Sequence, residues 1–309
     1  MCSSDLHAGA TPTGKNLRGY LARHADAARI LLDPAGRGWD DTSSATLVLR
    51  GDEAATAHAL AAHARPAEAS WLSRWQQAEA RAHEVPSASS GWEASVAQAV
   101  AESGRPVWAG SSLPVRDLDR YVAPHSTKRQ PITWANRGAS GIDGVLSSAA
   151  GASAVAGDVV AYVGDLSFQH DVGGLAAVSA HAPRLTIVVA NNGGGAIFDH
   201  LPVAGHVGAD ELDRLIVMPQ SFDLGRACQA FGVPHARVHA DGSAARLGAV
   251  LRRTRAGVVE VMLDRSTCAD RRREHAAAVV TEMDRLVATW RSPARGRKGQ
   301  AKATVGRTR

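Results

Sequence analysis

The feature that most constrains the fold is a series of short runs that are apolar for most of their length. They are PVWAG, PITWANRG, VVAYVGD, LTIVVANN, PHARVHA and GVVEVMLD, which start at residues 106, 131, 159, 185, 234 and 257. Stretches with helical spacing separate them, namely VRDLDRYV, DGVLSSAAGASAVA, SFQHDVGGLAAVSAHA, SFDLGRACQAFG and SAARLGAVLRRTR. A strand without a polar face must be covered on both sides. The pattern therefore predicts an α/β fold, a doubly wound parallel sheet with helices on both faces.

The first part of the chain has a different pattern. RILLDPAGR and ATLVLRGD predict two strands, and EAATAHALAAHA and PAEASWLSRWQQAEARAHE predict two helices before a linker, VPSASSG. Two strands and two helices make a poor domain alone. We therefore expect residues 1–85 to be the remnant of a middle domain plus a connecting helix, and 86–290 to be the main C-terminal domain.

Charge and composition exclude several classes of protein. The net charge is +5, but residues 291–309 hold seven Lys/Arg and no acid, so the rest of the chain has 28 basic and 30 acidic residues, a net of −2. These last residues predict a basic disordered tail rather than a nucleic-acid surface. The three cysteines form no CxxC pair, which argues against disulfides or zinc. Without an 18-residue apolar run or a signal pattern, we expect a cytoplasmic protein with no membrane span.

Polar residues follow two consecutive predicted strands at the point where each strand ends. Gly164 and Asp165 end VVAYVGD, and Asn192 ends LTIVVANN just before Gly193–Gly195. Because ligands of parallel sheets bind beyond the carboxyl ends of strands, these groups should meet. A carboxylate, an amide oxygen and a glycine carbonyl suit Mg²⁺, and a helix starting near Leu166 would favour a diphosphate. Either site alone is better explained as a helix cap or a loose turn; their pairing favours the metal site.

The spacing of these residues resembles a known family motif. Asp165, Asn192 27 positions later and Gly194 two positions beyond match the signature of the thiamine diphosphate-dependent decarboxylases and carboligases. The resemblance implies that thiamine diphosphate is the cofactor. It also implies that the Asp165 and Asn192 side chains and the Gly194 carbonyl bind Mg²⁺.

Three further segments narrow the resemblance. GSSLPVRDLD (110–119), NRGASGIDG (136–144) and NNGGGAIFDHLP (191–202) resemble the MenD family, the 2-succinyl-5-enolpyruvyl-6-hydroxy-3-cyclohexene-1-carboxylate synthases of menaquinone biosynthesis. The likeness runs from Trp92 to about Leu286 and is weaker before it. It implies a transferase that decarboxylates 2-oxoglutarate and adds the remaining unit to isochorismate.

The resemblance also assigns residues to the cofactor. It implies that Ile142 supports the cofactor from beneath and that Ile197 and Phe198 surround the reacting carbon. The other implied cofactor contacts are Ser140, Gly141, Gly164, Leu166, Ser167 and Ala196.

Two arginines match substrate positions of the family. Arg116 and Arg137, with Ser112 as a neutral partner, would bind the carboxylates of both substrates, because a guanidinium offers a bidentate donor fork. From the residues alone, ion pairs with Asp117 or Asp143 are the simpler explanation. Six of the thirteen histidines, at 170, 181, 200, 206, 235 and 239, form no metal-ligand spacing, and we expect structural or solvent-facing roles for them.

The family also requires a glutamate that activates the cofactor from a separate N-terminal α/β domain of the neighbouring subunit. None of Glu53, Glu68, Glu79 or Glu84 has a suitable context. We therefore expect a C-terminal fragment that is inactive alone and belongs to a homodimer or tetramer. Alternatives are another thiamine diphosphate enzyme, such as an acetolactate synthase or 2-oxoacid decarboxylase, or a non-catalytic cofactor-binding fragment. No GxGxxG follows a strand and no GxxxxGK[ST] occurs, which disfavours nicotinamide and ATP.

Overall fold

The computed structural model describes residues 4–9, 13–38, 40, 42–85, 91–123, 131–239 and 244–291. Most of the predicted linker and all of the predicted basic tail beyond Arg291 lie outside the described residues.

The main domain is built on a six-stranded parallel sheet with the strand order β5-β4-β6-β7-β9-β8. The strands are β4 (Val107–Ala109), β5 (Thr133–Ala135), β6 (Val159–Gly164), β7 (Leu185–Asn191), β8 (His235–His239) and β9 (Gly257–Met262). Each of the six predicted apolar runs contains one of these strands, so the strand prediction is confirmed.

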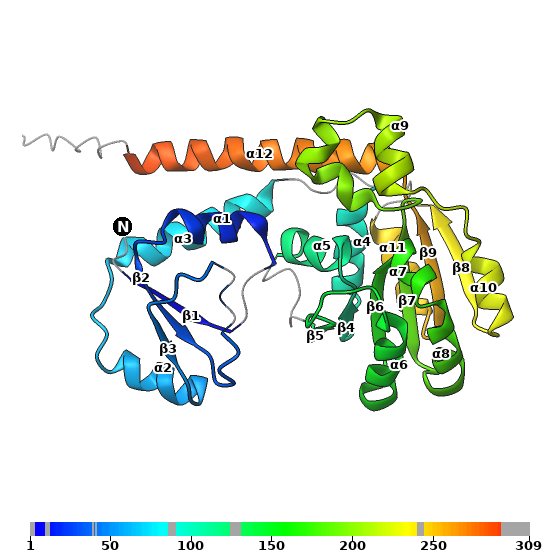
Figure 1. Cartoon of the computed structure of the whole chain (residues 1–309), viewed down its shortest axis with the longest axis horizontal. Helices are drawn as coiled ribbons and strands as arrows, with labels where there is room; N and C mark the ends of the chain where they lie inside the picture. Colours follow the sequence, from blue (N-terminus) through cyan, green and yellow to red (C-terminus); the bar gives the residue numbers. More distant parts are fainter. Residues whose placement is uncertain are drawn as a thin grey trace, which may run out of the picture.

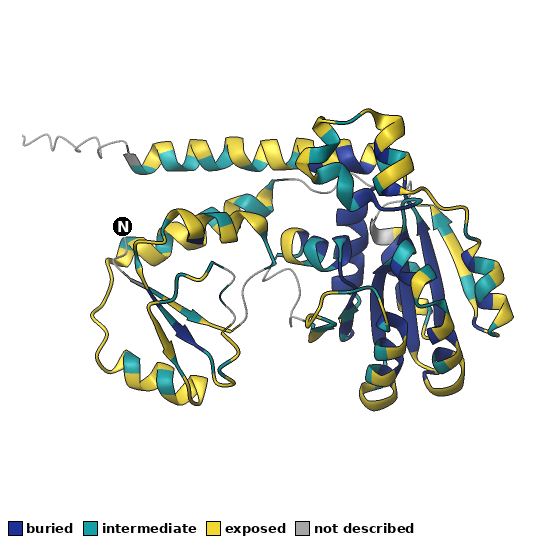
Figure 2. Ribbon diagram, in the orientation of Figure 1, coloured by how far each residue is buried: buried dark blue, intermediate teal, exposed yellow. Residues whose placement is uncertain are grey.

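Helices cover both faces of this sheet (Figure 1). One core combines α4 (Glu93–Glu102), α5 (Leu113–Tyr121) and α11 (Ala244–Arg253) with one face of the strands. The other combines α6 (Val145–Ala156), α7 (Asp165–His170), α8 (Leu175–His181) and α10 (Leu224–Ala230) with the opposite face. Along β6, Val160 and Tyr162 join the first core, and Val159, Ala161 and Val163 join the second. This alternation of fully buried residues between the two cores confirms the doubly wound fold. The central strands of the sheet are coloured as buried in Figure 2.

The N-terminal unit has one more strand and one more helix than the sequence predicted, namely β1 (Ser4–Ala8) and α1 (Lys15–Arg23). Its parallel sheet has the order β1-β2-β3, formed by β1 together with β2 (Ala28–Leu32) and β3 (Leu47–Leu49). Helices α1, α2 (Glu53–Ala61) and α3 (Ala69–Glu84) accompany it. The prediction of two strands was wrong because β1 is an edge strand with a polar sequence, SDLHA, and its Leu6 is 49% exposed.

Three α-helices of the main domain were not predicted. They are α4, the short α9 (Ala209–Leu212) and α12 (Arg265–Arg291), and the mixed pattern of apolar and charged residues in α12 gives no single buried stripe. The start of α12 packs into the main domain through Cys268, and its later turns lie beside α3 (Figure 1). There Arg81 Nε lies 3.4 Å from Glu282 Oε1. None of the described helices combines the length and apolar character needed to cross a lipid bilayer.

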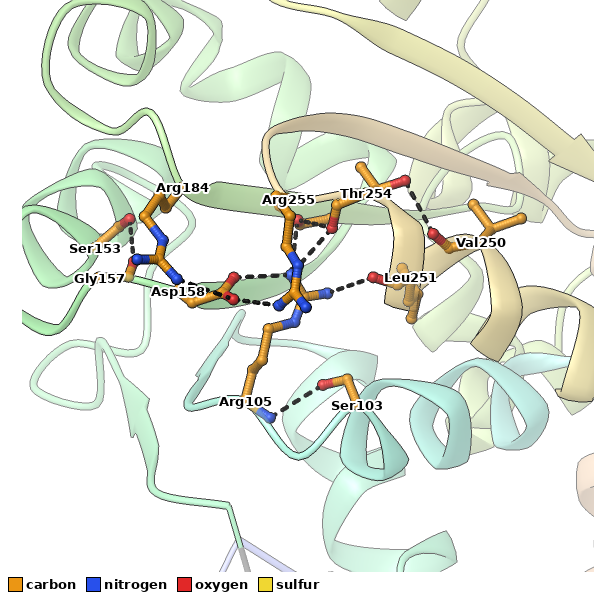
Figure 3. A network of polar contacts seen from close by, with 11 residues as sticks. Ser103, Arg105, Ser153, Gly157, Asp158, Arg184, Val250, Leu251, Thr254 and Arg255 are labelled. Atoms are coloured by element: carbon orange, nitrogen blue, oxygen red, sulfur yellow. Dashed lines mark hydrogen bonds and ion pairs between the residues drawn. The ribbon is translucent and has the colours of Figure 1, made fainter.

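A polar network ties together the amino ends of the strands (Figure 3). Asp158, just before β6, accepts a 3.2 Å hydrogen bond from Arg105 Nη1 and another from Arg255. Arg105, whose side chain is 8% exposed, also donates to Thr186 Oγ1 and the Leu251 carbonyl. Burial raises the pKa of Asp158, but hydrogen bonding and attraction from the arginines outweigh it, so the pKa lies below its usual range. The network connects the amino ends of β4, β6, β7 and β9. It therefore lies at the opposite end of the strands from Asp165 and Asn192.

Replacing Asp158 with Asn is expected to lower the free energy of unfolding by about 3 kcal/mol, because the buried Arg105 would lose its counter-charge. Urea unfolding monitored by circular dichroism at pH 7 measures this. The control is Arg184→Gln, which removes an exposed partner 3.5 Å from the same carboxylate. It should cost less than about 1 kcal/mol. Equal effects of the two variants would contradict this account.

The same variant tests pH dependence. A carboxylate with a lowered folded-state pKa stabilises the fold fully above its unfolded pKa of about 3.9, and that contribution is lost as pH falls through the folded pKa. The unchanged protein should therefore lose more stability between pH 5 and acidic pH than Asp158→Asn does. If the free energy of unfolding of the two proteins changed equally with pH, Asp158 would not contribute to the pH dependence of stability.

Candidate cofactor and metal site

A cavity of about 210 Å³ lies at the carboxyl ends of β4, β6 and β7. The chain passes from β4 outward to β5 and then returns to β6 on the other side of β4, so the strand order reverses between β4 and β6. Such a switch point leaves a crevice because the loops on its two sides turn in opposite directions. The fold thus places the cavity where doubly wound sheets bind ligands.

Most of the residues predicted from the sequence line this cavity. They are Ser112, Ile142, Gly164, Asp165, Leu166, Ser167, Asn192, Gly194, Ala196, Ile197 and Phe198. The structure therefore brings together residues from four segments that are as far apart in sequence as 112 and 198. The remaining predicted residues, Arg116, Arg137, Ser140 and Gly141, lie outside its lining.

Asp165 is a buried carboxylate at the start of α7. It is 7% exposed, and burial raises its pKa to about 6, although backbone N–H groups of Leu166, Gly194 and Gly193 oppose the rise. The Leu166 N–H donates to Asp165 Oδ1 at 2.9 Å. These opposing groups are all amide dipoles rather than full charges. A bound cation would supply the missing charge compensation.

Asn192 and Gly194 line the same cavity. Asn192 Oδ1 is buried and lacks a hydrogen-bond partner among the described residues, a state that folded proteins avoid unless a ligand satisfies the atom. Gly194 has φ +149°, and a Cβ there would lie 3.1 Å from the Val217 carbonyl oxygen. One carboxylate, one unsatisfied amide oxygen and a glycine backbone form a hard-oxygen donor set that fits Mg²⁺.

Arg116 lies at the rim rather than in the cavity, and Arg137 lies close enough to repel it. Arg116 Nη1 donates a 2.6 Å hydrogen bond to the carbonyl of Ser112, which lines the cavity. Burial, followed by repulsion from Arg137, lowers the pKa of Arg116. Two mutually repelling guanidinium groups, one of them at the cavity rim, suit an anionic ligand.

Ser112 and Ser140 both adopt positive φ, at 75° and 56°. A non-glycine residue in this region is strained, and such strain concentrates at functional sites. Ser140 lies exposed in the loop that leads to Ile142.

The two acids considered as ion-pair partners of Arg116 and Arg137 contact other residues instead. Asp117 is fully buried and accepts a 2.7 Å hydrogen bond from Arg272 Nη2. Asp143 lies 3.3 Å from His170 Nδ1, and that histidine is half exposed, as expected for a solvent-facing residue. Within the described ranges, no group of three or more His, Cys, Asp or Glu residues could hold a metal.

The sequence analysis missed three polar residues that also line the cavity, Glu93, Asp117 and Tyr162. Burial raises the pKa of Asp117 to about 7, despite the attraction of Arg272, and Glu93 adds to the rise. Both Glu93 carboxylate oxygens lack a hydrogen-bond partner among the described residues, with Arg272 Nη2 3.7 Å from one of them. No sequence signal links Asp117 to Arg272, because 155 positions separate them.

Comparison with known proteins agrees with this geometry. Residues 117–264 match the family model described as thiamine pyrophosphate enzyme, C-terminal TPP binding domain. Three curated relatives are each named 2-succinyl-5-enolpyruvyl-6-hydroxy-3-cyclohexene-1-carboxylate synthase. The relative from Sorangium cellulosum is 38% identical over 84% of this chain and 45% of its own length. The relative from Halobacterium salinarum is 38% identical over 89% of this chain and 48% of its own length. The relative from Geobacillus thermodenitrificans is 37% identical over 74% of this chain and 41% of its own length. The chain thus spans about half the length of the curated relatives it matches.

Replacing Gly194 with Ala is expected to destabilise the protein more than replacing Gly193 with Ala. Both glycines have positive φ, but a Cβ at Gly193 meets open space, whereas one at Gly194 meets backbone atoms of Val217 and Pro219. We expect a loss of about 2 to 3 kcal/mol for Gly194→Ala and about 1 kcal/mol for Gly193→Ala. Denaturant midpoints measure both, and identical midpoints would contradict the close approach.

Proposed function

We propose that this chain, which belongs to the MenD-type thiamine diphosphate-dependent enzymes, forms the cofactor-binding half of a carboligase of menaquinone biosynthesis. The proposed reaction decarboxylates 2-oxoglutarate and adds the remaining succinyl-semialdehyde unit to isochorismate. The observation that carries the proposal is the convergence of Asp165, the unsatisfied Asn192 Oδ1 and Gly194 on one cavity at the switch point.

In this proposal the Asp165 and Asn192 side chains and the Gly194 carbonyl hold Mg²⁺, which binds the diphosphate of the cofactor. Thiamine diphosphate, when bound, supplies the nucleophilic carbon that allows a 2-oxo acid to lose CO₂. The chain's own contribution at this end is binding and charge compensation. Three oxygen donors leave room in an octahedral shell for phosphate oxygens and water.

The apolar lining serves the other end of the cofactor. Ile142 reaches the cavity from the loop before α6, and Ile197 and Phe198 reach it from the loop after β7. We assign Ile142 to holding the cofactor from beneath. Ile197 and Phe198 exclude water around the reacting carbon, which favours loss of CO₂ from a carboxylate that water would otherwise stabilise. Ser140 and Gly141 are assigned to the adjacent pyrimidine end, and Gly164, Leu166, Ser167 and Ala196 to contacts along the cofactor.

The two arginines are assigned to the substrates. Both proposed substrates carry two carboxylates, and Arg116 and Arg137 offer two guanidinium forks close enough to repel one another. Ser112 adds a neutral donor. An acetolactate synthase or a simple 2-oxoacid decarboxylase acts on substrates with one carboxylate. The paired arginines therefore favour the dicarboxylate reaction.

The proposal includes a homodimer or tetramer in the full-length form and a cytoplasmic location. Trp71, Leu72 and Trp75 of α3 are 45%, 56% and 53% exposed, and association would cover apolar surface of this kind. The glutamate that activates the cofactor in this family is proposed to come from a neighbouring subunit. On this view the chain binds the cofactor but needs that partner for turnover.

Binding of thiamine diphosphate is expected to require Mg²⁺ and to weaken by about tenfold or more in Asn192→Ala, because a metal ligand is lost. Isothermal titration calorimetry with and without Mg²⁺ measures this. Asn16→Ala in α1 is the matched control, since it makes the same substitution in the N-terminal unit and should leave the affinity unchanged. Tight binding of thiamine diphosphate without Mg²⁺, or an unchanged affinity in Asn192→Ala, would contradict the proposed metal site.

With thiamine diphosphate and Mg²⁺ present, 2-oxoglutarate is expected to bind more tightly than pyruvate. Replacing Arg116 with Met should remove most of this preference. It should also weaken the binding of 2-oxoglutarate by about tenfold or more, as expected for a lost charge-assisted hydrogen bond. Competition calorimetry with both acids gives the ratio. Arg120→Met, an exposed arginine on the same helix, is the control. A preference for pyruvate would favour the acetolactate synthase or decarboxylase alternative.

A further inference from the structure

Glu260 is a fully buried acid in the middle of β9, and no role assigned above uses it. Its neighbours Val258, Val259 and Val261 are buried apolar residues of the core. In the sheet it lies opposite Val189 of β7 on one side and Arg237 of β8 on the other. A charge in such a position is costly unless its partners are well placed.

Three side chains from two neighbouring strands surround the Glu260 carboxylate. Asn191 Nδ2 donates to Oε1 at 2.6 Å, His235 Nε2 lies 2.8 Å from Oε2, and Arg237 Nε donates to Oε2 at 2.9 Å. Burial raises the pKa of Glu260, but the hydrogen bonds from Arg237, Asn191 and His235 outweigh it and hold the pKa below its usual range. Glu260 is therefore an ionised acceptor that fixes the orientation of the Asn191 amide.

The Asn191 amide in turn holds the loop that carries two proposed metal ligands. Its Oδ1 accepts a 3.1 Å hydrogen bond from the Gly193 N–H. From the other side, the Gly193 carbonyl accepts from the Gln220 N–H at 3.1 Å, and the Gly195 N–H donates to the Val217 carbonyl at 2.9 Å. Asn192 and Gly194 alternate with these anchored residues, so the anchors determine where their oxygens point.

We propose that Glu260 is a positioning residue which, through Asn191, orients the Asn192–Gly194 loop for binding a divalent cation. The cation itself rests on the proposed function, whereas the ordering of the loop does not. Residues that hold metal ligands in place commonly affect metal affinity by about 10- to 100-fold when removed. The competing explanation is that Glu260 only neutralises Arg237 and His235 and stabilises the sheet.

The first test is amide hydrogen exchange of the whole chain without ligand, read by mass spectrometry on peptides covering residues 190–196. Glu260→Met removes the acceptor and should speed exchange in this loop by about tenfold or more, while peptides from β6 change much less. Glu260→Gln keeps an acceptor oxygen and should retain much of the protection. Arg237→Gln removes an exposed partner of the same carboxylate and should leave the loop unchanged.

A double substitution tests the route through Asn191. Asn191→Ala should reproduce the loop exchange of Glu260→Met, and the two changes together should add little, because both break one chain of contacts. Unchanged loop protection in Glu260→Met, with only a lower overall stability, would overturn the proposal. Additive effects of the two substitutions would do the same.

The second test is the Mg²⁺ concentration needed for half-maximal binding of thiamine diphosphate. It should rise by about 10- to 100-fold in Glu260→Met and stay unchanged in Arg237→Gln. A loosened loop with an unchanged Mg²⁺ requirement would overturn the role in metal binding. If the unsubstituted chain binds no thiamine diphosphate, the proposed function fails, and the exchange experiment still decides whether Glu260 positions the loop.

Discussion

The structure depends on one geometric constraint, the common direction of the parallel strands. All six carboxyl ends point to the same edge, and the reversal of strand order between β4 and β6 opens a crevice there. The polar residues that end β6 and β7 meet in that crevice because their strands are direct neighbours. The opposite edge carries the Asp158 network, which fastens the strand starts and places no group near the cavity. The residues that stabilise the sheet thus lie at the amino ends of the strands, and the residues of the proposed binding site lie at the carboxyl ends.

The binding edge holds polar groups whose burial works against folding. Asp165 lacks a full countercharge among the groups that lower its pKa, and the Asn192 and Glu93 oxygens lack hydrogen-bond partners among the described residues. Each such group costs about 1 to 3 kcal/mol of unfolding free energy while no ligand satisfies it. For Asn192, the surrounding contacts through Gly193, Gly195 and Glu260 hold the loop in place nonetheless. A preorganised loop of this kind binds a cation without first having to order itself.

Much of the main domain could be predicted because its central strands β4, β6, β7 and β9 are buried on both faces and therefore apolar. Asp165 and Asn192 followed from the same logic, since strand ends and their spacing are local features, whereas Ser112, Ile142, Ile197 and Phe198 followed only from the resemblance to a known family. What failed depends on long-range contacts: β1 is recognisable only through its pairing with β2, and α12 through its packing on α3. Asp117 in RDLD was considered as a surface partner of Arg116, but Arg272 draws it into the interior. Glu260 is similar, because its partners Asn191 and His235 lie on other strands.

The most direct measurement of the central claim is the position of a bound metal ion. Crystals of this chain grown with Mn²⁺ and thiamine diphosphate would show manganese by its anomalous scattering. The account predicts one peak within bonding distance of an Asp165 carboxylate oxygen, Asn192 Oδ1 and the Gly194 carbonyl, with the diphosphate completing the shell. Manganese bound elsewhere, or a diphosphate bound at this edge without metal, would contradict it.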